Sequence, residues 1–324
     1  MRVKGSVVVI TGAASGIGRA TALRFAAEGA TVVVASRRAK ALATLTEECR
    51  RHGVEALGVP TDVTDATAVD ELARRTVERF GRIDVWVNNA AVTFFSPFLK
   101  VPVEDFRRVL DVNVMGYVHG ARAALTQMQL QGAGVLVNVA SIVGEVPQPY
   151  TSAYSVSKAA VRALGASLRS ELLLDREKHI DVVTVLPATI DTPFFRHAAN
   201  YTGREVVPMP PLYSPQRVAR AIVKAVESPR REVVVGPAGR QFAVQHRVAP
   251  GTTEAMMAVQ TDRTHLSRHN AAPDSPGNLY SPSSEPRDAE VEGGWGGRRR
   301  TAQRRLALLG LAVGTGVVLR RALR

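Results

Sequence analysis

The sequence predicts one α/β domain, built as a doubly wound parallel sheet, followed by a C-terminal extension. Up to about residue 236, short β-branched runs alternate with longer amphipathic stretches. The short runs are apolar throughout, as expected for strands that helices cover on both faces. Alternating strands and helices with short joints favour a parallel sheet, whose ligand crevice lies at the carboxyl ends of the strands.

The elements are expected in regular alternation along the chain. The expected strands are residues 7–11, 31–35, 55–60, 84–87, 135–139, 181–186 and 232–235. The expected helices are residues 17–28, 39–52, 66–80, 103–128, 153–174 and 215–227. Each motif described below directly follows one of these strands or lies in one of these helices, which is where this fold class places its chemistry.

The domain organisation is indicated by a change of composition after about residue 250. Residues 1–250 are expected to form a dinucleotide-binding and catalytic domain, and residues 251–297 a linker or extension rich in Pro, Ser and Gly. Residues 298–324 form a basic and hydrophobic tail. Cys49 is the one cysteine of the chain, which excludes an intrachain disulfide and a cysteine-based metal site. The histidines show no metal-binding spacing, so no metal is expected.

The charge of the chain favours anionic partners. The formal net charge is +13, and residues 287–324 alone hold nine Lys or Arg against three Asp or Glu. No zinc-finger spacing or aromatic–basic interleaving supports nucleic acid as a partner. The apolar run 306–319 has 14 residues, fewer than the roughly 20 that span a membrane comfortably. It is expected to pack on the body or a second subunit, or to contact a membrane through residues 298–324.

The N-terminal region gives an expectation for the location of the protein. Its first apolar run is too short for the core of a secretory signal peptide. We therefore expect a cytoplasmic protein, with attachment to the cytoplasmic face of the membrane by the C-terminal tail as the alternative.

A glycine-rich segment, TGAASGIG, follows the first expected strand and opens the first expected helix. Backbone N–H groups at a helix N-terminus bind pyrophosphate, and glycines let that group approach closely. The segment predicts a dinucleotide site, and a purely structural turn is the alternative. The residues expected to contact the cofactor are Gly12, Ser15, Gly16, Ile17 and Gly18.

The end of the second expected strand indicates which nicotinamide cofactor is bound. A site for NAD usually places an acidic side chain there, where it binds the ribose 2′-hydroxyl. Here Ser36 is followed by Arg37 and Arg38. Because guanidinium groups pair well with phosphate oxygens, the sequence favours NADP(H), with NAD(H) as the alternative. The two arginines could instead be ordinary solvated charges at a helix start.

Tyr154 and Lys158 are four residues apart in an expected helix and so share one face. A phenol with its usual pKa near 10 is a poor base at neutral pH. A neighbouring ammonium group would lower that pKa and give a general acid–base. A tyrosine four residues before a lysine is common by chance, so the neighbouring motifs must decide whether the pair is catalytic. Ser141 follows the expected strand 135–139, and Asn113 lies in the preceding helix.

Together these motifs resemble the short-chain dehydrogenase/reductase family, in its single-domain branch with a Rossmann-type fold. The resemblance runs from about Val7 to Val235. It adds Asp62 and Val63 after the third strand, Asn-Asn-Ala-Ala at residues 88–91, and the segment 187–192. Ala91 and Ala188 stand where the family usually has Gly, which bears on loop geometry rather than on the chemistry.

The resemblance implies a catalytic tetrad of Asn113, Ser141, Tyr154 and Lys158. Tyr154 would exchange a proton with the substrate oxygen, and Ser141 would hold that oxygen. Lys158 would bind the nicotinamide ribose and tune Tyr154, while Asn113 would support a water. The further cofactor-binding residues that it implies are Asp62, Val63, Asn89, Ala90, Tyr154, Lys158, Pro187, Ile190 and Thr192.

These observations predict an NADP(H)-dependent oxidoreductase that interconverts a ketone or aldehyde and an alcohol by hydride transfer. The loops 142–151 and 193–213 are largely apolar, with Phe94, Phe95 and Phe98 as further candidates, which favours a hydrophobic small molecule as substrate. The resemblance also implies a homodimer or homotetramer. The alternative is a non-catalytic NADP-binding regulatory or membrane-associated scaffold protein, which would require an incomplete tetrad.

Overall fold

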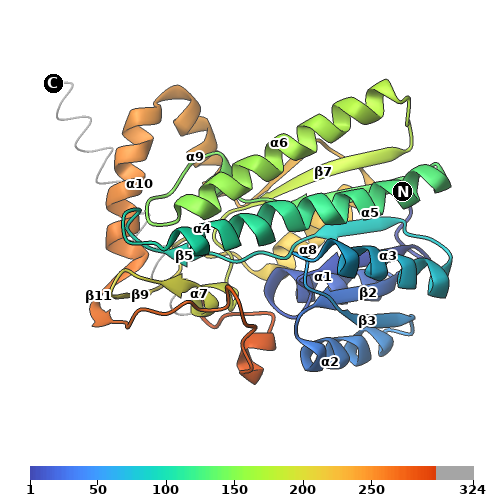
Figure 1. The fold of residues 1–324 in the computed structure, drawn as a ribbon. Helices are drawn as coiled ribbons and strands as arrows, with labels where there is room; N and C mark the ends of the chain where they lie inside the picture. Colours follow the sequence, from blue (N-terminus) through green and yellow to red (C-terminus); the bar gives the residue numbers. More distant parts are fainter. Residues whose placement is uncertain (297–324) are drawn as a thin grey trace.

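The computed structural model describes residues 1–296, which form a seven-stranded parallel sheet between two layers of helices (Figure 1). The strands of this sheet are β1 (Val7–Thr11), β2 (Thr31–Ser36), β3 (Ala56–Pro60), β4 (Val85–Asn88), β6 (Gly134–Val139), β7 (Ile180–Pro187) and β10 (Glu232–Val235). Their order is β10-β7-β6-β4-β1-β2-β3. The direction of winding reverses between β1 and β4, which opens the crevice that such sheets use for ligands.

Helices cover both faces of the sheet, so the predicted doubly wound fold is confirmed. One face carries α1 (Gly16–Ala27), α2 (Ala39–Arg50) and α8 (Pro215–Glu227). The other carries α3 (Ala66–Phe80), α4 (Val103–Leu110), α5 (Gly116–Gln131) and α6 (Ser152–Leu174). Successive strand side chains enter opposite layers, with Val8 in the first and Val9 in the second. This explains why the strands carry apolar side chains on both faces rather than at alternate positions only.

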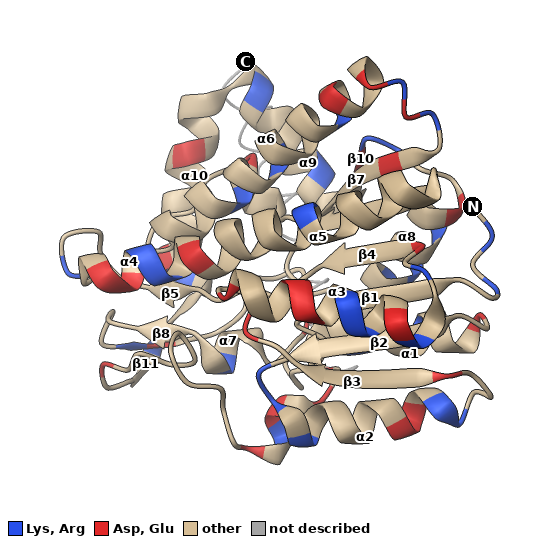
Figure 2. Ribbon diagram, turned by 45° about the vertical axis from the view of Figure 1, so that its right-hand side comes forward, with Lys and Arg blue, Asp and Glu red and all other residues tan. Residues whose placement is uncertain are grey.

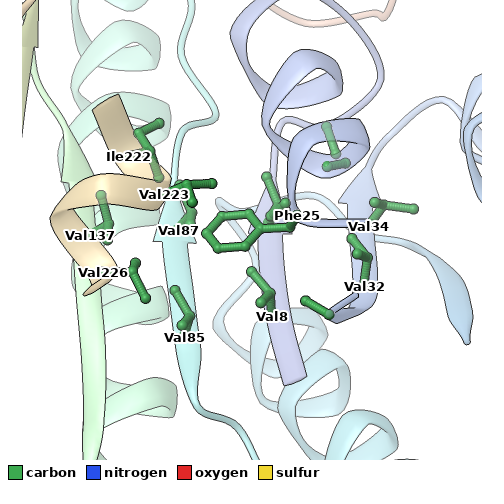
Figure 3. Packing of buried hydrophobic residues seen from close by; sticks show 14 of the residues in the cluster. Val8, Phe25, Val32, Val34, Val85, Val87, Val137, Ile222, Val223 and Val226 are labelled. Carbon is green, nitrogen blue, oxygen red and sulfur yellow. The ribbon is translucent and has the colours of Figure 1, made fainter. Parts of the chain in front are cut away.

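The first layer centres on Phe25 of α1, which is fully buried. Figure 3 shows its ring between Val8 of β1 and Val87 of β4, with Ile222 and Val223 of α8 close by. Burying an aromatic side chain of this size contributes about 1.5–3 kcal/mol. The packing of α1 and α8 on the central strands therefore fixes the start of α1, where the glycine-rich segment lies.

The outer surfaces of the helices are charged with both signs interspersed, as Figure 2 shows for α2 and α3. Helix α3 has the bounds that the sequence predicts. Asp65 caps it by accepting hydrogen bonds from the N–H groups of Thr67 and Ala68, and Gly81 ends it in the left-handed conformation with φ 79°.

The helix expected over residues 103–128 is divided in the structure. A π-helical turn at Asp111–Met115 separates α4 from α5. Within it, the side chain of Asn113 exchanges two hydrogen bonds with the backbone of Val92, each of 2.9 Å. Such turns often occur at functional sites because they redirect side chains within a helix. The helical spacing of apolar residues does not predict this π-helical turn, because that spacing continues through it.

The region after residue 236 is more ordered than the sequence predicts. It contains α9 (Pro237–Val248), α10 (Pro250–Thr264) and β11 (Leu266–Ala271). Strand β11 pairs antiparallel with β9 (Arg204–Val206), and β5 (Phe94–Phe95) pairs with β8 (Ala199–Asn200). The segment expected as a linker thus packs against the domain. In Figure 1, its orange-to-red end lies between β11 and α2.

Residues 278–296, which we call the strap, continue from this region with little regular structure except the 3₁₀ turn Pro286–Ala289. No helix within residues 1–296 is long and apolar enough to cross a membrane. The predicted tail, residues 298–324 with its apolar run 306–319, lies outside the described residues.

Candidate active site

A cavity of about 270 Å³ opens at the carboxyl ends of the central strands. The residues predicted from the sequence that line it are Gly12, Ser15, Gly16, Ile17, Ser36, Arg37, Arg38, Asp62, Val63, Asn89, Ala90, Ser141, Tyr154, Lys158, Pro187, Ile190 and Thr192. Gly18 and Asn113 are not among the residues that line it. Almost the whole predicted set therefore meets around one space.

The glycine-rich segment is held against the element that follows β4. A Cβ on Gly12 would lie 2.6 Å from Cα of Ala90, and a Cβ on Gly18 would lie 2.4 Å from the carbonyl oxygen of Gly12. Asn89 donates from Nδ2 to the carbonyl oxygens of Thr11 and Gly12, at 3.0 and 3.2 Å. The glycines are thus required for close packing, and Asn89 positions the loop as well as lining the cavity.

Ala91 and Ala188 fit where the resembling family usually has glycine. Within residues 1–296, the non-glycine residues with positive φ are Tyr150 and Arg176, so neither alanine needs a left-handed backbone. A Cβ on Gly236 would lie 3.0 Å from Cβ of Ala188. Glycine at position 236 therefore leaves room for the methyl group of Ala188.

Arg37 and Arg38 lie at the end of the cavity formed by β2, and both are bound by the strap. Arg37 donates from Nη1 to the carbonyl oxygen of Tyr280 and from Nη2 to that of Asn278, each at 2.8 Å. Arg38 donates to the carbonyl oxygens of Glu285 and Asp288, at 2.8 and 2.6 Å. Burial lowers the pKa of both guanidinium groups. They are therefore fixed groups rather than ordinary solvated charges.

Asp62 is engaged at the same end of the cavity. Its Oδ1 accepts hydrogen bonds from the backbone N–H and the hydroxyl of Thr64, at 3.0 and 2.9 Å, and its Oδ2 lies 3.3 Å from Nη2 of Arg108. Arg108 also donates from Nε to the carbonyl oxygen of Leu279 in the strap, at 3.0 Å. Burial alone would raise the pKa of Asp62, but the Thr64 hydrogen bonds and the nearby arginines lower it.

The far end of the strap returns to the glycine-rich segment. Gly16 donates its N–H to the carbonyl oxygen of Glu290 at 3.0 Å. The N–H of Trp295 donates to the carboxylate of Asp191 at 3.0 Å, and its indole donates to the carbonyl oxygen of Thr192 at 3.1 Å. Asn278, Pro282 and Ser283 line the cavity, so the strap forms part of its wall.

Lys158 lies on α6 and is almost completely buried. Its Nζ donates to the carbonyl oxygen of Val139 at 2.9 Å and to the hydroxyl of Tyr117 at 3.1 Å, and it lies 5.5 Å from the ring centroid of Tyr154. Burial lowers the pKa of Lys158 to about 7. The ammonium and amine forms are therefore both accessible at neutral pH.

Tyr154 differs from the sequence-based expectation in the direction of its pKa. We expected Lys158 to lower that pKa, but burial raises it to about 12, and a hydrogen bond with Ser141 opposes the rise only in part. Desolvation dominates because it disfavours the phenolate directly. The hydroxyl of Ser141 also accepts a hydrogen bond from the N–H of Val143 at 3.2 Å. The tyrosine is thus a neutral phenol at neutral pH, a form that can donate a proton.

Asn113 lies behind the cavity and connects the π-helical turn to α6. Besides its two bonds to Val92, it donates to the hydroxyl of Ser157 at 3.0 Å, and that hydroxyl donates to the carbonyl oxygen of Tyr154 at 2.8 Å. The side chain of Asn113 therefore supports the segment that carries Tyr154.

Aromatic side chains line the cavity beyond Tyr154. The ring centroid of Phe194, in the short helix α7 (Phe194–His197), lies 5.6 Å from that of Tyr154. Phe95, Phe195, Ile142 and Val143 also line the cavity. Of the other phenylalanine candidates, Phe94 belongs to the sheet core and Phe98 is 67% exposed, so neither lines it.

Comparison with known proteins assigns the chain to a family. Residues 6–201 match the short chain dehydrogenase family. The protein is a short-chain dehydrogenase/reductase. The family predicted from the motifs is therefore confirmed, and the chain is an oxidoreductase. An uncharacterised oxidoreductase of Bacillus subtilis, YxnA, is 34% identical over 296 residues, which are 91% of this chain and 83% of that protein.

Two solved structures are similar to this dehydrogenase. A short-chain dehydrogenase/reductase from Burkholderia phymatum, in complex with NAD, has a TM-score of 0.71 at 28% identity, covering 78% of this chain and 96% of its own. An alcohol dehydrogenase from the archaeon Thermococcus sibiricus, complexed with 5-hydroxy-NADP, has a TM-score of 0.62 at 26% identity, covering 72% and 96%. These likenesses support a nicotinamide cofactor.

Several residues of the dehydrogenase site were not predicted from the sequence. Tyr117 binds Lys158, and its position one helical turn after Asn113 is a signal that could have found it. His265, Gln148 and the strap residues line the cavity without any motif to mark them. Within residues 1–296, no group of three or more His, Cys, Asp or Glu could hold a metal ion.

Proposed function

We propose that the protein is an NADP(H)-dependent oxidoreductase that interconverts a ketone or aldehyde and an alcohol, and that its substrate is hydrophobic. The observation that carries this proposal is the shared cavity. Ser141, Tyr154 and Lys158 line the same space as the glycine-rich segment and Arg37. Groups suited to proton transfer thus lie beside groups suited to a dinucleotide.

The residues along the cavity are of the kinds that bind each part of a nicotinamide dinucleotide. The start of α1 at Gly16 is a helix N-terminus without obstructing side chains, which suits a pyrophosphate, and the carbonyl oxygen of Glu290 in the strap accepts the N–H of Gly16 there in the structure. Val63 and Asp62 would flank the adenine, while Lys158, Ile190 and Thr192 would hold the nicotinamide end. When bound, the nicotinamide supplies or accepts the hydride.

The preference for NADP(H) rests on Arg37 and Arg38. No carboxylate occupies the end of β2, where Ser36 stands, and the hydroxyl of Ser36 accepts a hydrogen bond from the N–H of Arg38 at 3.1 Å. Planar guanidinium groups at this place suit a 2′-phosphate. A phosphate would bind the N–H groups that the strap carbonyls leave free, or would replace those carbonyls.

The protein's part in the reaction is proton transfer and orientation. In reduction, the neutral phenol of Tyr154 donates its proton to the carbonyl oxygen, and the hydroxyl of Ser141 donates a hydrogen bond to the same oxygen. Lys158 can then exchange a proton near neutral pH, because its pKa lies near 7. The aromatic wall beyond Tyr154 favours an apolar substrate and excludes water.

The proposal is tested by turnover of a panel of hydrophobic ketones and alcohols, followed by NADPH absorbance. Tyr154→Phe should lower kcat at least about 100-fold, because the general acid is lost, while the Kd for NADPH changes little. Tyr280→Phe is the matched control, since its hydroxyl bonds to Asp105 outside the cavity lining. Turnover near the wild-type rate in Tyr154→Phe would refute the proposed role.

A further inference from the structure

The joint between α10 and β11 places a histidine in the wall of the active-site cavity. His265 is only 4% exposed, and its backbone is fixed on both sides. Its N–H donates to the carbonyl oxygen of Thr261 at 3.0 Å, and its carbonyl oxygen accepts from the N–H of Val207 at 2.9 Å. His265 comes from the C-terminal extension, outside the matched family region of residues 6–201.

The imidazole lies at the end of a continuous aromatic wall that begins at Tyr154. Ring centroids are 5.6 Å apart between Tyr154 and Phe194, 5.7 Å between Phe194 and Phe195, and 5.5 Å between Phe195 and His265. The ring of Phe95 contacts His265 from another side, edge to face at 4.8 Å. All five side chains line the cavity, so a molecule held at Tyr154 can extend along this wall toward His265.

A buried nitrogen of His265 has no partner in the described part of the chain. Nδ1 is shielded from solvent and has no hydrogen-bond partner of normal geometry within residues 1–296, and the same holds for Nε2 of Gln148 on the loop after β6. The backbone at Val207 and at His265 itself lies near enough to the imidazole to oppose the effect of burial on its pKa, but it does not satisfy Nδ1 with a well-formed bond. Both side chains line the cavity. A buried polar atom without a partner destabilises a protein. Two such atoms around one cavity are available to form hydrogen bonds with a bound molecule.

The chemistry of the missing partner follows from the ionisation of His265. Burial lowers the pKa of its imidazole to about 4, so the ring is neutral at neutral pH. A neutral imidazole has one donor and one acceptor nitrogen, and it gives no charge to attract a carboxylate or phosphate. A hydroxyl, carbonyl or amide group is therefore the matching partner. The aromatic rings between the two ends require that the intervening part of the molecule is apolar.

We propose that His265 is a specificity-determining residue, and that the substrate is an apolar ketone or alcohol with a second, uncharged hydrogen-bonding group remote from its reacting carbon. Gln148 would assist in holding that second group. This inference rests on the proposed oxidoreductase function and deepens it by naming the substrate class. It assigns a role in substrate recognition to the C-terminal extension.

The test uses straight-chain methyl ketones in matched pairs, ending in either a methyl or a hydroxyl group, over a series of chain lengths. The wild-type protein should show a higher kcat/KM for the hydroxylated member, by about tenfold at the best length, the scale of one added hydrogen bond to a buried group. The advantage should appear mainly in KM, because the second group lies away from the reacting carbon.

Three variants separate recognition from packing. His265→Phe keeps an aromatic ring against Phe95 and Phe195 but removes the nitrogens, and should reduce the ratio of kcat/KM for the hydroxylated ketone to that for the methyl-ended ketone to about one. His265→Asn should restore part of the advantage, because an amide can replace the lost hydrogen bond. His269→Asn, on the exposed side of β11, should leave the advantage unchanged.

A structural role alone would give a different pattern. Equal kcat/KM values for both members of every pair in the wild-type protein, or an unchanged hydroxyl advantage in His265→Phe, would overturn the inference while leaving the oxidoreductase proposal intact. Binding of each pair to the NADPH complex is also measured by calorimetry. If no ketone is turned over but binding still favours the hydroxylated member in a His265-dependent way, the proposed function fails and the recognition role stands.

Discussion

At the residue scale, the surroundings of Arg37 bear on its proposed role in binding the cofactor. Backbone carbonyl oxygens of the strap accept hydrogen bonds from both of its Nη atoms. The negative charge of Asp62 raises its pKa and the positive charge of Arg108 lowers it, although burial has the largest effect. The side chain is thus pre-oriented at the proposed adenosine end of the cavity, and fixing a guanidinium group in advance would reduce the entropy lost when a phosphate binds.

Arg37→Asp should shift cofactor preference from NADPH toward NADH. One charge-assisted hydrogen bond contributes about 1.5–3 kcal/mol, so kcat/KM for NADPH should fall at least about tenfold, and the new carboxylate should favour the free 2′-hydroxyl of NADH. Steady-state kinetics with both cofactors measure this, together with thermal unfolding to monitor the strap. Arg220→Asp on the exposed side of α8 is the control. A wild-type preference for NADH would contradict the assignment.

The residues that could be predicted from the sequence are those carried by short motifs. Short, fixed spacings in the sequence separate Tyr154 from Lys158 and the glycines near Gly12 from one another. Such spacings can be recognised without knowledge of the fold. The direction of the Tyr154 pKa could not be predicted, because it depends on burial by segments distant in the sequence. His265 could not be predicted either, since its neighbours Phe95 and Phe195 meet it only through tertiary packing.

At the element scale, the sequence predicts the bounds of the sheet strands and most helices to within a few residues. The elements α9, α10 and β11 escape it, and so do the π-helical turn and the strap. The π-helical turn at Asp111–Met115 depends on the bonds between Asn113 and Val92, which lie 21 residues apart. The strap has no hydrophobic period, and it is held mainly through backbone carbonyls, which every residue type possesses. Leu279 is its buried apolar anchor.

The strap is expected to complete the cofactor site, and Gly293→Val tests this expectation. A Cβ on Gly293 would lie 2.3 Å from the carbonyl oxygen of Thr192, so valine must displace the strap from the 187–192 loop. The Kd for NADPH should rise several-fold, because Asn278 and Ser283 form part of the cavity wall. Fluorescence titration measures it.

Gly251→Val is the matched control for the strap, because a Cβ on Gly251 meets no atom within 4 Å. Its Kd for NADPH should equal that of the wild-type protein. Tighter binding of NADPH in Gly293→Val would show instead that the strap obstructs the site and must open before the cofactor enters.

At the scale of the whole molecule, the active site places a strongly ionisable group inside the folded core. Lys158 is buried between β6 and α5, where the carbonyl oxygen of Val139 and the hydroxyl of Tyr117 are the groups among residues 1–296 that bind its Nζ. Neither partner carries a neutralising charge. The same residue that serves the proposed chemistry therefore destabilises the fold whenever it is protonated.

The destabilisation of the fold by protonated Lys158 should appear in the pH dependence of the free energy of unfolding. The pKa of Lys158 is about 7 in the folded chain against 10.5 for an unperturbed lysine. Between these values the unfolded chain binds more protons, so the contribution of Lys158 to the free energy of unfolding rises with pH. Below about pH 7 the destabilisation is complete, and above about pH 10.5 it has disappeared.

Lys158→Met removes the ionisable group, so the stability of this variant relative to the wild-type protein should depend on pH. The difference in the free energy of unfolding, variant minus wild type, should fall by about 3 kcal/mol between about pH 7 and about pH 10. Any constant loss of the bonds to Val139 and Tyr117 shifts this difference but does not change its slope. Urea unfolding at several pH values measures it, with Lys100→Met on the exposed surface as the control. A difference that stays constant with pH would mean that Lys158 keeps an ordinary pKa in the folded protein, and that proton exchange at neutral pH must be assigned to another group.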